Sequence, residues 1–580
     1  MAAPSVLKSI LANWKLIFTL VYPILLCPVL VQHPGPEGKG AYTLLLMAGY
    51  WITECISIYV TAMLPLLMGP LMGIMASKSI CSAYMKDAIM LFIHGAFLAV
   101  AAEHRNIHRR IGNAVIRIMG GDPRLLLLGL MLPTWFLSMW MSNAAATIMM
   151  LTIVDALLGK LESLKPKKDD VEEGVALRSD EEWNTGDSNE SVTTKTPADT
   201  DDLDKLACAF SLGVAYASSC GGMGTVIGTP TNVVLFGLVA SRYGSDTGLN
   251  FGSWAAYGAP LSLIMVLVTW VVLGMFFIGP KRFFQCRGSD KARKAAIHQI
   301  LEEEKKTLGP VSWAEGSAMG ILLMVIVLWV TRKPGVDGWS VITVSKVENK
   351  KTIQYVTDSQ PAVLGTILLC VWPAINPFRR RRTDEPPANR LETVLPWKIA
   401  SSKCPWTVLF LIGGGFALSD ICSESGLSRA VSTYMLGLKS LPIFALILVF
   451  SCLSMIMTTF VANAATANVL LPIMFELSEN LNIHPYYLGL PVTIAASMAF
   501  MLPAGTPANA IVYSKGRINI NQMMLAGALV AVAGVIIVTL CTVSYAVPIF
   551  GLNQFPDWAQ VNNVTIPTTQ VFNTSTTPAY

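Results

Sequence analysis

Residues 458–512 decide the fold of this 580-residue chain, because they place two short polar motifs inside long apolar sequence. The motifs are NAATA at residues 463–467 and GTPAN at residues 505–509. Related motifs, NAAAT at residues 143–147 and GTPTN at residues 228–232, occur earlier in the chain in the same order. The chain therefore carries the same element twice.

Small and helix-breaking residues at membrane depth free backbone groups that have no water to bond, so they are tolerated where they line a cavity. Secondary transporters with internal repeats place their binding sites at such interrupted helices, near the middle of the membrane. The duplicated motifs accordingly predict a binding site between two broken helices.

The composition predicts an all-α polytopic membrane protein. Hydrophobic residues make up 53% of the chain and charged residues only 14%, against about 25% charged residues in an ordinary soluble domain. Apolar runs that can cross the hydrocarbon layer recur along the chain, and several must hold two helices, so we expect about eleven crossings. The eleven cysteines are scattered, and neither metal-ligand spacing nor a nucleophile–base pattern stands out. We therefore expect neither an enzyme nor a nucleic-acid partner, but a protein surrounded by membrane lipid.

The distribution of charge predicts the orientation. Basic residues in the polar loops, such as the run at residues 379–382, favour the cytoplasmic side for those loops. The tail after Pro548 has no basic residue and contains N-glycosylation acceptor patterns at Asn563 and Asn573. We therefore expect a cytoplasmic N-terminus and an extracellular C-terminus, which requires an odd number of crossings.

The repeat extends upstream of the motifs. The stretch LFIHGAF at residues 91–97 corresponds to FLIGGGF at residues 410–416. Because these glycine-containing apolar stretches are short for a membrane crossing, we expect each to form a re-entrant hairpin. The two hairpins would enter from opposite faces, so the repeat is expected to be inverted.

The motifs also offer ligands for sodium and for an anion. Sodium needs several oxygen ligands, which Asn side chains and the carbonyls of an unwound helix supply, while helix N-termini present amide hydrogens to an anion. Two candidate cation sites therefore flank one candidate anion site. Their expected sodium ligands are Ser138, Ser142, Asn143 and the Gly228 backbone in the first half, and Thr458, the Val461 backbone, Asn463 and the Gly505 backbone in the second.

Each motif alone has an ordinary structural explanation. Asn-Ala-Ala is also typical of close helix packing in membranes, and Gly-Thr-Pro of a helix kink. The ordered duplication of both motifs favours a functional role.

At these residues the chain resembles the divalent anion/sodium symporter family, solute carrier family 13, over nearly its whole length. The stretches that carry the resemblance are WITE at 51–54, VTAMLP at 60–65, GGGFAL at 413–418 and ASMAFMLPAGTPANAIV at 496–512. The resemblance implies an eleven-helix protomer with two hairpins, a homodimer, and an elevator mechanism in which a transport domain carries substrate past a fixed scaffold. It also implies that the motifs bind substrate carboxylates, through Ser142, Asn143, Ala144, Thr229, Asn463, Ala464, Thr506 and Pro507.

The chain departs from the usual Ser-Asn-Thr motif of this family. The first copy has Ser142-Asn143-Ala144 and the second has Ala462-Asn463-Ala464, so two threonine hydroxyls and one serine hydroxyl are missing. Insect carriers of the Indy type, which exchange carboxylates without sodium, are similar in the first copy.

We expect a secondary active transporter of di- and tricarboxylates, such as succinate and citrate, coupled to sodium ions and located in the plasma membrane. Sulfate transport and sodium-independent carboxylate exchange are alternatives within transport. An ion channel or a ligand-sensing receptor is the alternative from another class.

These expectations divide the chain into six consecutive segments: residues 1–159, N-terminal scaffold helices with the first hairpin and Asn motif; 160–205, a disordered cytoplasmic loop; 206–279, the remainder of the first repeat; 280–403, cytoplasmic linkers and connecting helices; 404–549, the second repeat with its hairpin and Asn motif; and 550–580, an extracellular glycosylated tail.

Overall fold

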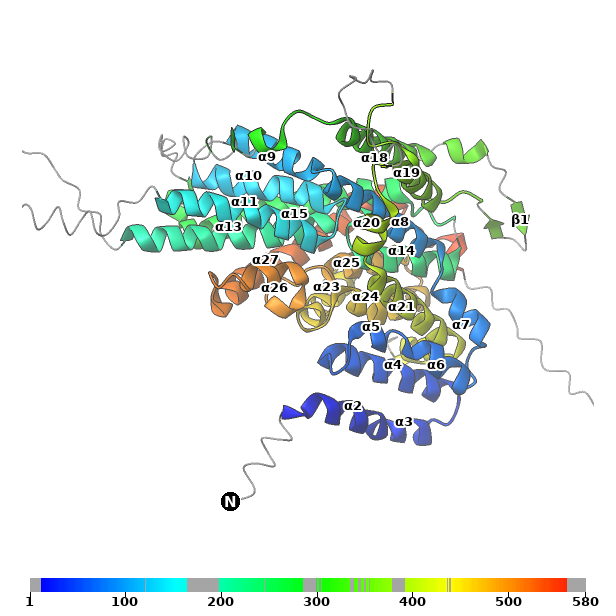
Figure 1. Ribbon diagram of the computed structural model, residues 1–580. Helices are drawn as coiled ribbons and strands as arrows, with labels where there is room; N and C mark the ends of the chain where they lie inside the picture. The colour runs from blue at the N-terminus through cyan, green and yellow to red at the C-terminus, as the bar shows by residue number, and fades with distance from the viewer. Residues whose placement is uncertain are drawn as a thin grey trace, which may run out of the picture.

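The computed structural model describes most of the chain between residues 12 and 560. The described ranges are 12–119, 122–163, 198–244, 246–284, 299, 302–303, 305–333, 338–342, 346–348, 351–353, 355–377, 392–434, 437 and 440–560. Within them the expected helical fold is confirmed (Figure 1). The exception is an antiparallel pair of short strands, β1 (Lys346–Glu348) and β2 (Lys351–Ile353).

Two series of elements follow each other in the same order, as the duplicated motifs predict. Each series has a long helix, an amphipathic helix, two hairpin helices, a further helix, a 3₁₀ turn, a shorter helix and a final long helix. The first series comprises α8 (Asp87–His104), α9 (Ile107–Met119), α10 (Pro123–Ser138), α11 (Asn143–Ser163), α13 (Ala198–Gly222), η1 (Val226–Gly228), α14 (Pro230–Tyr243) and α15 (Phe251–Leu273). The second comprises α21 (Trp406–Glu424), α22 (Leu427–Tyr434), α23 (Ile443–Phe460), α24 (Asn463–Leu481), α25 (Tyr486–Ala495), η5 (Pro503–Gly505), α26 (Pro507–Tyr513) and α27 (Ile520–Val543).

The remaining described elements precede, connect and follow the two series. Those before the first series are α2 (Trp14–Leu25), α3 (Cys27–Gln32), α4 (Pro36–Thr53), α5 (Ile58–Thr61), α6 (Leu64–Leu71) and α7 (Ser77–Ala83). Those between the series are the π-turn η2 (Gly274–Ile278), α16 (Pro280–Phe284), α18 (Trp313–Arg332), η3 (Trp339–Ile342), the two strands, α19 (Ser359–Val371) and α20 (Trp397–Lys403). The chain continues after the second series with α28 (Ala546–Phe550) and η6 (Asp557–Ala559).

The lengths and apolar composition of the helices agree with a multi-pass membrane protein. Among the described residues, seven helical segments are long and apolar enough to cross a membrane. Other apolar helices, including α10 and α25, are only 10–17 residues long. The chain therefore crosses the membrane several times, while the count of about eleven remains a prediction.

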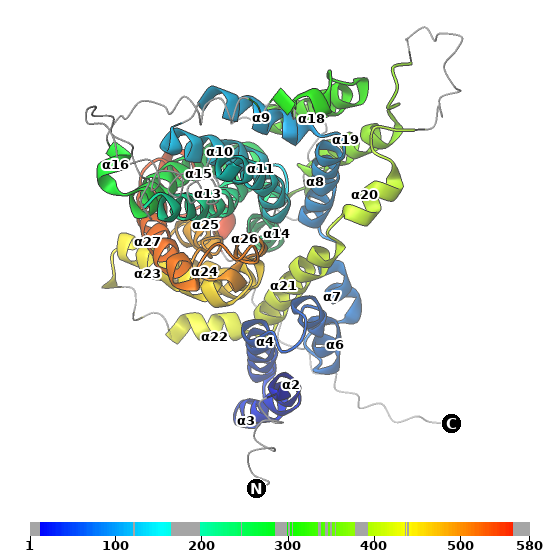
Figure 2. The same cartoon turned by 60° about the vertical axis from the view of Figure 1, so that its left-hand side comes forward.

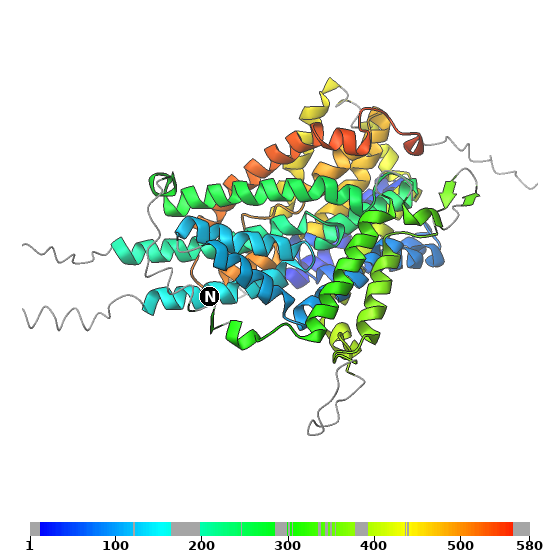
Figure 3. The ribbon, with the colours of Figure 1, turned by 90° about the horizontal axis from the view of Figure 1, so that it is seen from above.

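The helices form two groups that Figure 2 separates clearly. Helices α10 to α15 and α23 to α27 make up one cluster, which we call the repeat cluster. Helices α4, α6, α7, α8, α19, α20 and α21 lie along one side of it, and contacts join α8 to α19 and α21 to α4, α6 and α7. Seen from above, α18 and α19 lie across the direction of α13 and α15 (Figure 3).

Within the repeat cluster the two series pack directly against each other. Helix α13 contacts α26, α14 contacts α24 and α25, and α15 contacts α27. Tyr216 of α13 is fully buried and donates its hydroxyl hydrogen to the Phe500 carbonyl, at 2.8 Å, in the break between α25 and α26. Arg242 at the end of α14 forms ion pairs with Glu476 and Glu479 of α24. The cluster is therefore a single body built from both repeats.

The predicted position of the two hairpins is wrong. Residues 91–97 lie within α8 and residues 410–416 within α21, and both are continuous helices. Short turns instead join α10 to α11 and α23 to α24, and the two helices of each pair pack against each other. Their turns, at residues 139–142 and 461–462, lead directly into Asn143 and Asn463. The Asn motifs themselves therefore stand at the hairpin tips.

The glycines of α21 serve close packing, which explains the error. A Cβ atom on Gly413 would lie 2.6 Å from the Tyr84 ring, and one on Gly414 or Gly415 would overlap the Ala62 carbonyl or the Asn468 side chain. The three glycines thus let α21 approach three different neighbours at short distance, as small residues do in membrane helices.

Two predicted boundaries also differ from the structure. Helix α11 continues to Ser163 and α13 begins at Ala198, so the predicted loop at residues 160–205 is helical at both ends, and residues 164–197 lie outside the described ranges. The tail predicted from residue 550 begins as folded structure, because Trp558 packs on Tyr243 with 4.9 Å between ring centroids. Asn563 and Asn573 lie outside the described residues.

The packing of α21 makes a testable prediction. We expect Gly415→Ala to lower the free energy of unfolding by about 1–3 kcal/mol, because the added methyl group overpacks the contact with Asn468. The matched control is Gly320→Ala in α18, where no described atom lies within 4 Å of the added Cβ. Thermal unfolding of the purified variants measures the difference, and equal midpoints for both variants would contradict the role of Gly415.

Candidate functional site

The first half of the site forms at the tip of the α10–α11 hairpin. Ser138, the last residue of α10, is fully buried and donates its hydroxyl hydrogen to Asn143 Oδ1 at 2.8 Å. Both Asn143 Oδ1 and the Gly228 carbonyl lie next to Gly222, since a Cβ on Gly222 would be 2.5 Å from the first and 3.1 Å from the second. The structure thus brings Ser138, Asn143 and the Gly228 carbonyl close together.

The second half of the site repeats this arrangement at the tip of the α23–α24 hairpin. Thr458 Oγ1 lies 2.9 Å from Asn463 Oδ1 and 2.5 Å from the Ala496 carbonyl. The backbone carbonyl oxygen of Thr458 lies next to Gly505, because a Cβ atom on Gly505 would be 3.6 Å from it. The Thr458 hydroxyl has one hydrogen for its two acceptors, Asn463 Oδ1 and the Ala496 carbonyl, so it shares that hydrogen between them. Thr458, Asn463 and Ala496 therefore form an oxygen cluster with fewer hydrogens than acceptors, which suits a bound cation.

The two helix breaks beside these tips end in the same way. Helix α13 ends at Gly222 and α25 at Ala495, and each is followed by a 3₁₀ turn that ends at the motif glycine. Thr229 (φ −147°, ψ 146°) and Thr506 (φ −144°, ψ 151°) are then extended, and a proline opens the next helix. Proline fits this first helical position because it has no N–H group to leave unsatisfied.

A side-chain amide closes each break. Asn232 Nδ2 donates to the carbonyls of Gly222 and Thr225, at 3.0 and 2.7 Å. Asn509 Nδ2 donates equivalently to the carbonyls of Ala499 and Leu502, at 2.7 and 3.1 Å. Both asparagines are fully buried. The Thr225 and Leu502 carbonyls also accept the backbone N–H groups of Gly228 and Gly505, at 3.3 and 3.2 Å. Among the described hydrogen bonds, it is therefore the Gly222 and Ala499 carbonyls that depend on the asparagine amide for a donor.

Sequence reasoning assigned no role to Asn232 and Asn509, although the signal was present. Both occupy the fifth position of the duplicated Gly-Thr-Pro motif. A duplicated asparagine after a helix break indicates a side chain that completes the hydrogen bonding of the broken backbone.

The hairpin tips differ in how the following helix begins. Ser142 is exposed and its Oγ accepts the Ala145 N–H at 3.3 Å, so it caps the start of α11. Ala462 has no such acceptor, and α24 begins without a side-chain cap. The first amides of α24 are therefore less satisfied than those of α11.

The remaining predicted residues lie around these clusters with different accessibility. Val461 is buried and extended at the end of α23. Thr229 and Thr506 are buried, and the Asn509 N–H donates to Thr506 Oγ1 at 3.4 Å. Ala464 is buried, Ala144 is half-buried and Pro507 is exposed. The accessible part of the predicted site is thus formed by Ser142, Asn143, Ala144, Asn463 and Pro507.

The predicted site contains no ionisable side chain, so its electrostatics come from dipoles. Helices α11, α14, α24 and α26 all begin at the predicted motifs. A helix N-terminus carries a partial positive charge and unpaired amide hydrogens, which favour an anion. Unwound carbonyls nearby favour a cation. The arrangement suits binding of an anion together with cations.

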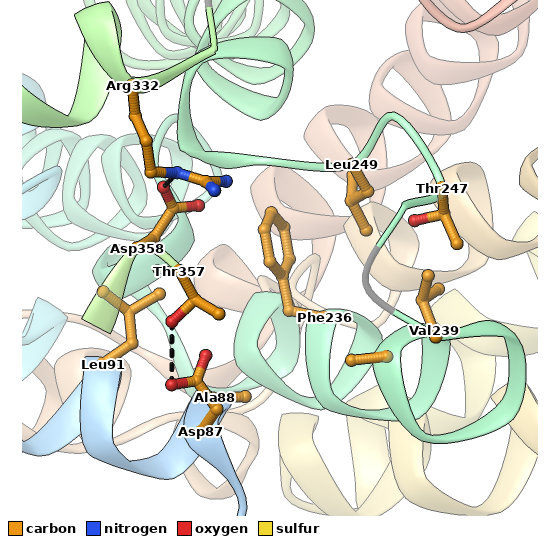
Figure 4. Close-up of a pocket in the computed structure, with 12 residues that line it drawn as sticks. Asp87, Ala88, Leu91, Phe236, Val239, Thr247, Leu249, Arg332, Thr357 and Asp358 are labelled. Carbon is orange, nitrogen blue, oxygen red and sulfur yellow. Dashed lines mark hydrogen bonds and ion pairs between the residues drawn. The ribbon is translucent and has the colours of Figure 1, made fainter. Parts of the chain in front are cut away.

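A separate pocket lies outside the predicted site, between α8, α14, α18 and the start of α19 (Figure 4). Arg332 Nε donates to Asp358 Oδ1 at 2.5 Å, and the Thr357 hydroxyl donates to Asp87 at 2.8 Å. Asp358 also accepts the Phe251 N–H at 2.8 Å, at the start of α15. These bonds join α18, the start of α19 and α8 to one another, and the Phe251 bond ties them to α15 of the repeat cluster, which indicates a structural role for the pocket.

The duplicated hairpins and helix breaks define this protein as a multi-pass membrane transporter with internal repeats. A family model described as "Sodium:sulfate symporter transmembrane region" matches residues 10–552. Solute carrier family 13 member 2 of Mus musculus is 37% identical, with 96% of each chain covered. "Protein I'm not dead yet" of Drosophila melanogaster is 35% identical over 95% of this chain and 92% of its own. The Na(+)/citrate cotransporter of Rattus norvegicus is 33% identical over 96% and 99%.

The chain therefore belongs to the divalent anion/sodium symporter family, solute carrier family 13. This confirms the resemblance seen in the sequence. The protein is a transporter, not an enzyme, and the channel and receptor alternatives are set aside.

The closure of the helix breaks makes a testable prediction. We expect Asn232→Leu and Asn509→Leu each to lower the free energy of unfolding by about 1–3 kcal/mol, because the buried carbonyl of Gly222 or of Ala499 loses its side-chain donor, while the carbonyls of Thr225 and Leu502 keep a backbone N–H. Asn553→Ala, an exposed substitution, is the control. Thermal unfolding of the purified protein measures the loss, and wild-type midpoints for both leucine variants would refute this role.

Proposed function

We propose that this protein carries di- and tricarboxylates, such as succinate and citrate, across the plasma membrane together with sodium ions. The observation that carries the proposal is the duplicated pair of Ser138 with Asn143 and Thr458 with Asn463, each beside an unwound segment. The simplest use of such a pair is that each half of the site, which we call a half-site, binds one carboxylate group of a dicarboxylate.

The orientation of the two asparagines supports carboxylate binding. Because Ser138 donates to Asn143 Oδ1, the Asn143 amide is held with Nδ2 on the opposite side from that hydroxyl. Thr458 fixes Asn463 in the same way. Each Nδ2 group offers two hydrogens, and hydrogen bonds to an ionised carboxylate are stronger than those between neutral groups.

The position of the missing hydroxyls supports sodium coupling. Ala144, Ala462 and Ala464 replace the hydroxyl residues of the usual motif, yet both oxygen clusters form without those hydroxyls, from Ser138 with Asn143 and from Thr458 with Asn463 and the Ala496 carbonyl. A dicarboxylate also brings two negative charges into a low-dielectric site, where an uncompensated charge is costly. Sodium ions held by the oxygen clusters would offset that cost.

The relatives support the same substrates. The rat relative is named for sodium and citrate, and a Mus musculus relative with 33% identity is named Na(+)/dicarboxylate cotransporter 3. Sulfate is the second candidate, because the matching family model is described as a sodium:sulfate symporter. Sodium-independent carboxylate exchange is the alternative coupling, because the Ser-Asn-Thr motif is incomplete in both copies.

We further propose that transport follows an elevator mechanism, in which the repeat cluster moves against the helices along its side. The separation of the two groups in Figure 2 supports this division. In our proposal the protein is a homodimer with its N-terminus in the cytoplasm. Its C-terminal tail is extracellular and glycosylated at Asn563 and Asn573, where the acceptor patterns lie.

The site assignment makes a direct prediction. We expect Asn143→Ala and Asn463→Ala each to abolish saturable uptake of labelled succinate, because each removes both the carboxylate donor and a cation ligand. Surface abundance, measured by biotinylation, should stay at the wild-type level, and the exposed control Asn553→Ala should transport normally. Normal uptake by both site variants would show that the substrate binds elsewhere.

Sodium coupling makes a second prediction. We expect replacement of external sodium by choline to reduce succinate uptake in vesicles to background, because the oxygen clusters lose the ion that compensates the carboxylate charge. Uptake that is unchanged in choline, but stimulated by succinate on the opposite side, would show exchange. Competition by sulfate at concentrations near those of succinate would favour the sulfate assignment.

A further inference from the structure

A pair of hydroxyl groups connects the two helix breaks. Thr231 Oγ1 and Ser497 Oγ lie 2.7 Å apart, one in the first turn of α14 and the other just after α25. Both residues are buried, with at most 1% of their surface exposed. The pair therefore forms a hydrogen bond between the first repeat and the second, away from water.

Each end of this bond continues to one half of the site. Thr231 Oγ1 lies 3.1 Å from Thr229 Oγ1, and Thr229 directly follows Gly228 of the first half-site. Ser497 directly follows Ala496, whose carbonyl belongs to the second oxygen cluster. A shift of one half-site relative to the other would strain this short chain of bonds.

Because the helix break is duplicated, the two repeats offer two equivalent positions for such a bond, and this bond occupies one of them. When the breaks are aligned on Gly222 and Ala499, which accept from Asn232 and Asn509, Ser497 corresponds to Cys220 and Thr231 corresponds to Ala508. Alanine has no hydrogen-bonding side chain, so the duplication by itself does not explain the hydroxyl pair. It is a feature of the interface between the repeats.

We propose that Thr231 and Ser497 are positioning residues that hold the two half-sites at the separation needed to bind one substrate molecule with its sodium ions. The inference rests on the proposed function. It assigns to the hydroxyl pair a role in affinity, separate from its contribution to folding.

The energetics of buried hydroxyls allow these two roles to be separated. Removing one partner leaves the other hydroxyl buried and less satisfied, which costs stability, whereas replacing both partners by apolar groups of similar shape is nearly neutral. The double variant Thr231→Val with Ser497→Ala lacks the bond and leaves neither hydroxyl of the pair buried alone, so we expect it to fold with little loss of stability, the remaining cost being the contact with Thr231 that Thr229 Oγ1 loses. Thr231→Ser keeps the hydroxyl and should preserve the bond.

The experiment measures uptake of labelled succinate at varied succinate and sodium concentrations, normalised to surface abundance. For the double variant we expect the Michaelis constant for succinate and the half-saturating sodium concentration both to rise by about tenfold, the effect of about 1.4 kcal/mol. The maximal rate and the thermal unfolding midpoint should change little. The single variant Thr231→Ser, which keeps the hydroxyl, should have both constants near the wild-type values.

The matched control is Thr493→Val. Thr493 is a fully buried threonine of α25 whose hydroxyl donates within its own helix, to the Gly489 carbonyl at 2.7 Å. This control should leave both constants unchanged. Wild-type constants in the double variant, or equal shifts in the double variant and the control, would overturn the positioning role. Absence of sodium-dependent carboxylate uptake in the wild type would instead overturn the proposed function itself.

Discussion

A backbone that leaves its helix inside a membrane must find its hydrogen-bond partners within the protein, since lipid offers none. This constraint governs both helix breaks. Asn232 and Asn509 meet it by donating to the carbonyls on either side of the unwound turn. With those carbonyls satisfied, the break can remain open, and the carbonyls next to Gly228 and Gly505 stay available to face a ligand.

A second consequence of the breaks is that helix N-termini, which favour an anion, lie close to oxygen atoms, which favour a cation. The hairpin tips place Asn143 and Asn463 at the starts of α11 and α24, where helix dipoles favour an anion. The same asparagines place Oδ1 beside the hydroxyls of Ser138 and Thr458, and oxygen atoms gathered at an unwound helix favour a cation. A site with both preferences suits a transporter that moves anions with cations.

The sequence predicted the class of fold because it follows from composition and from duplicated motifs. Its two sets of candidate ligands contain residues that the fold brings together, since Ser138 lies beside Asn143 and Thr458 beside Asn463. The sequence misplaced the hairpins because glycines in an apolar stretch predict a turn and a packing contact equally well. Only the neighbours of Gly413 to Gly415, which are distant in sequence, decide between the two. The same reason hid the bond between Thr231 and Ser497.

The central claim is that the two half-sites hold one substrate molecule between them. A structure determined by electron cryomicroscopy in lipid nanodiscs, with saturating succinate and sodium, tests it most directly. We predict one succinate with one carboxylate at Asn143 and the other at Asn463, and cation density in both oxygen clusters. Succinate bound away from either asparagine, or hairpin tips that face lipid with no ligand between them, would contradict the account.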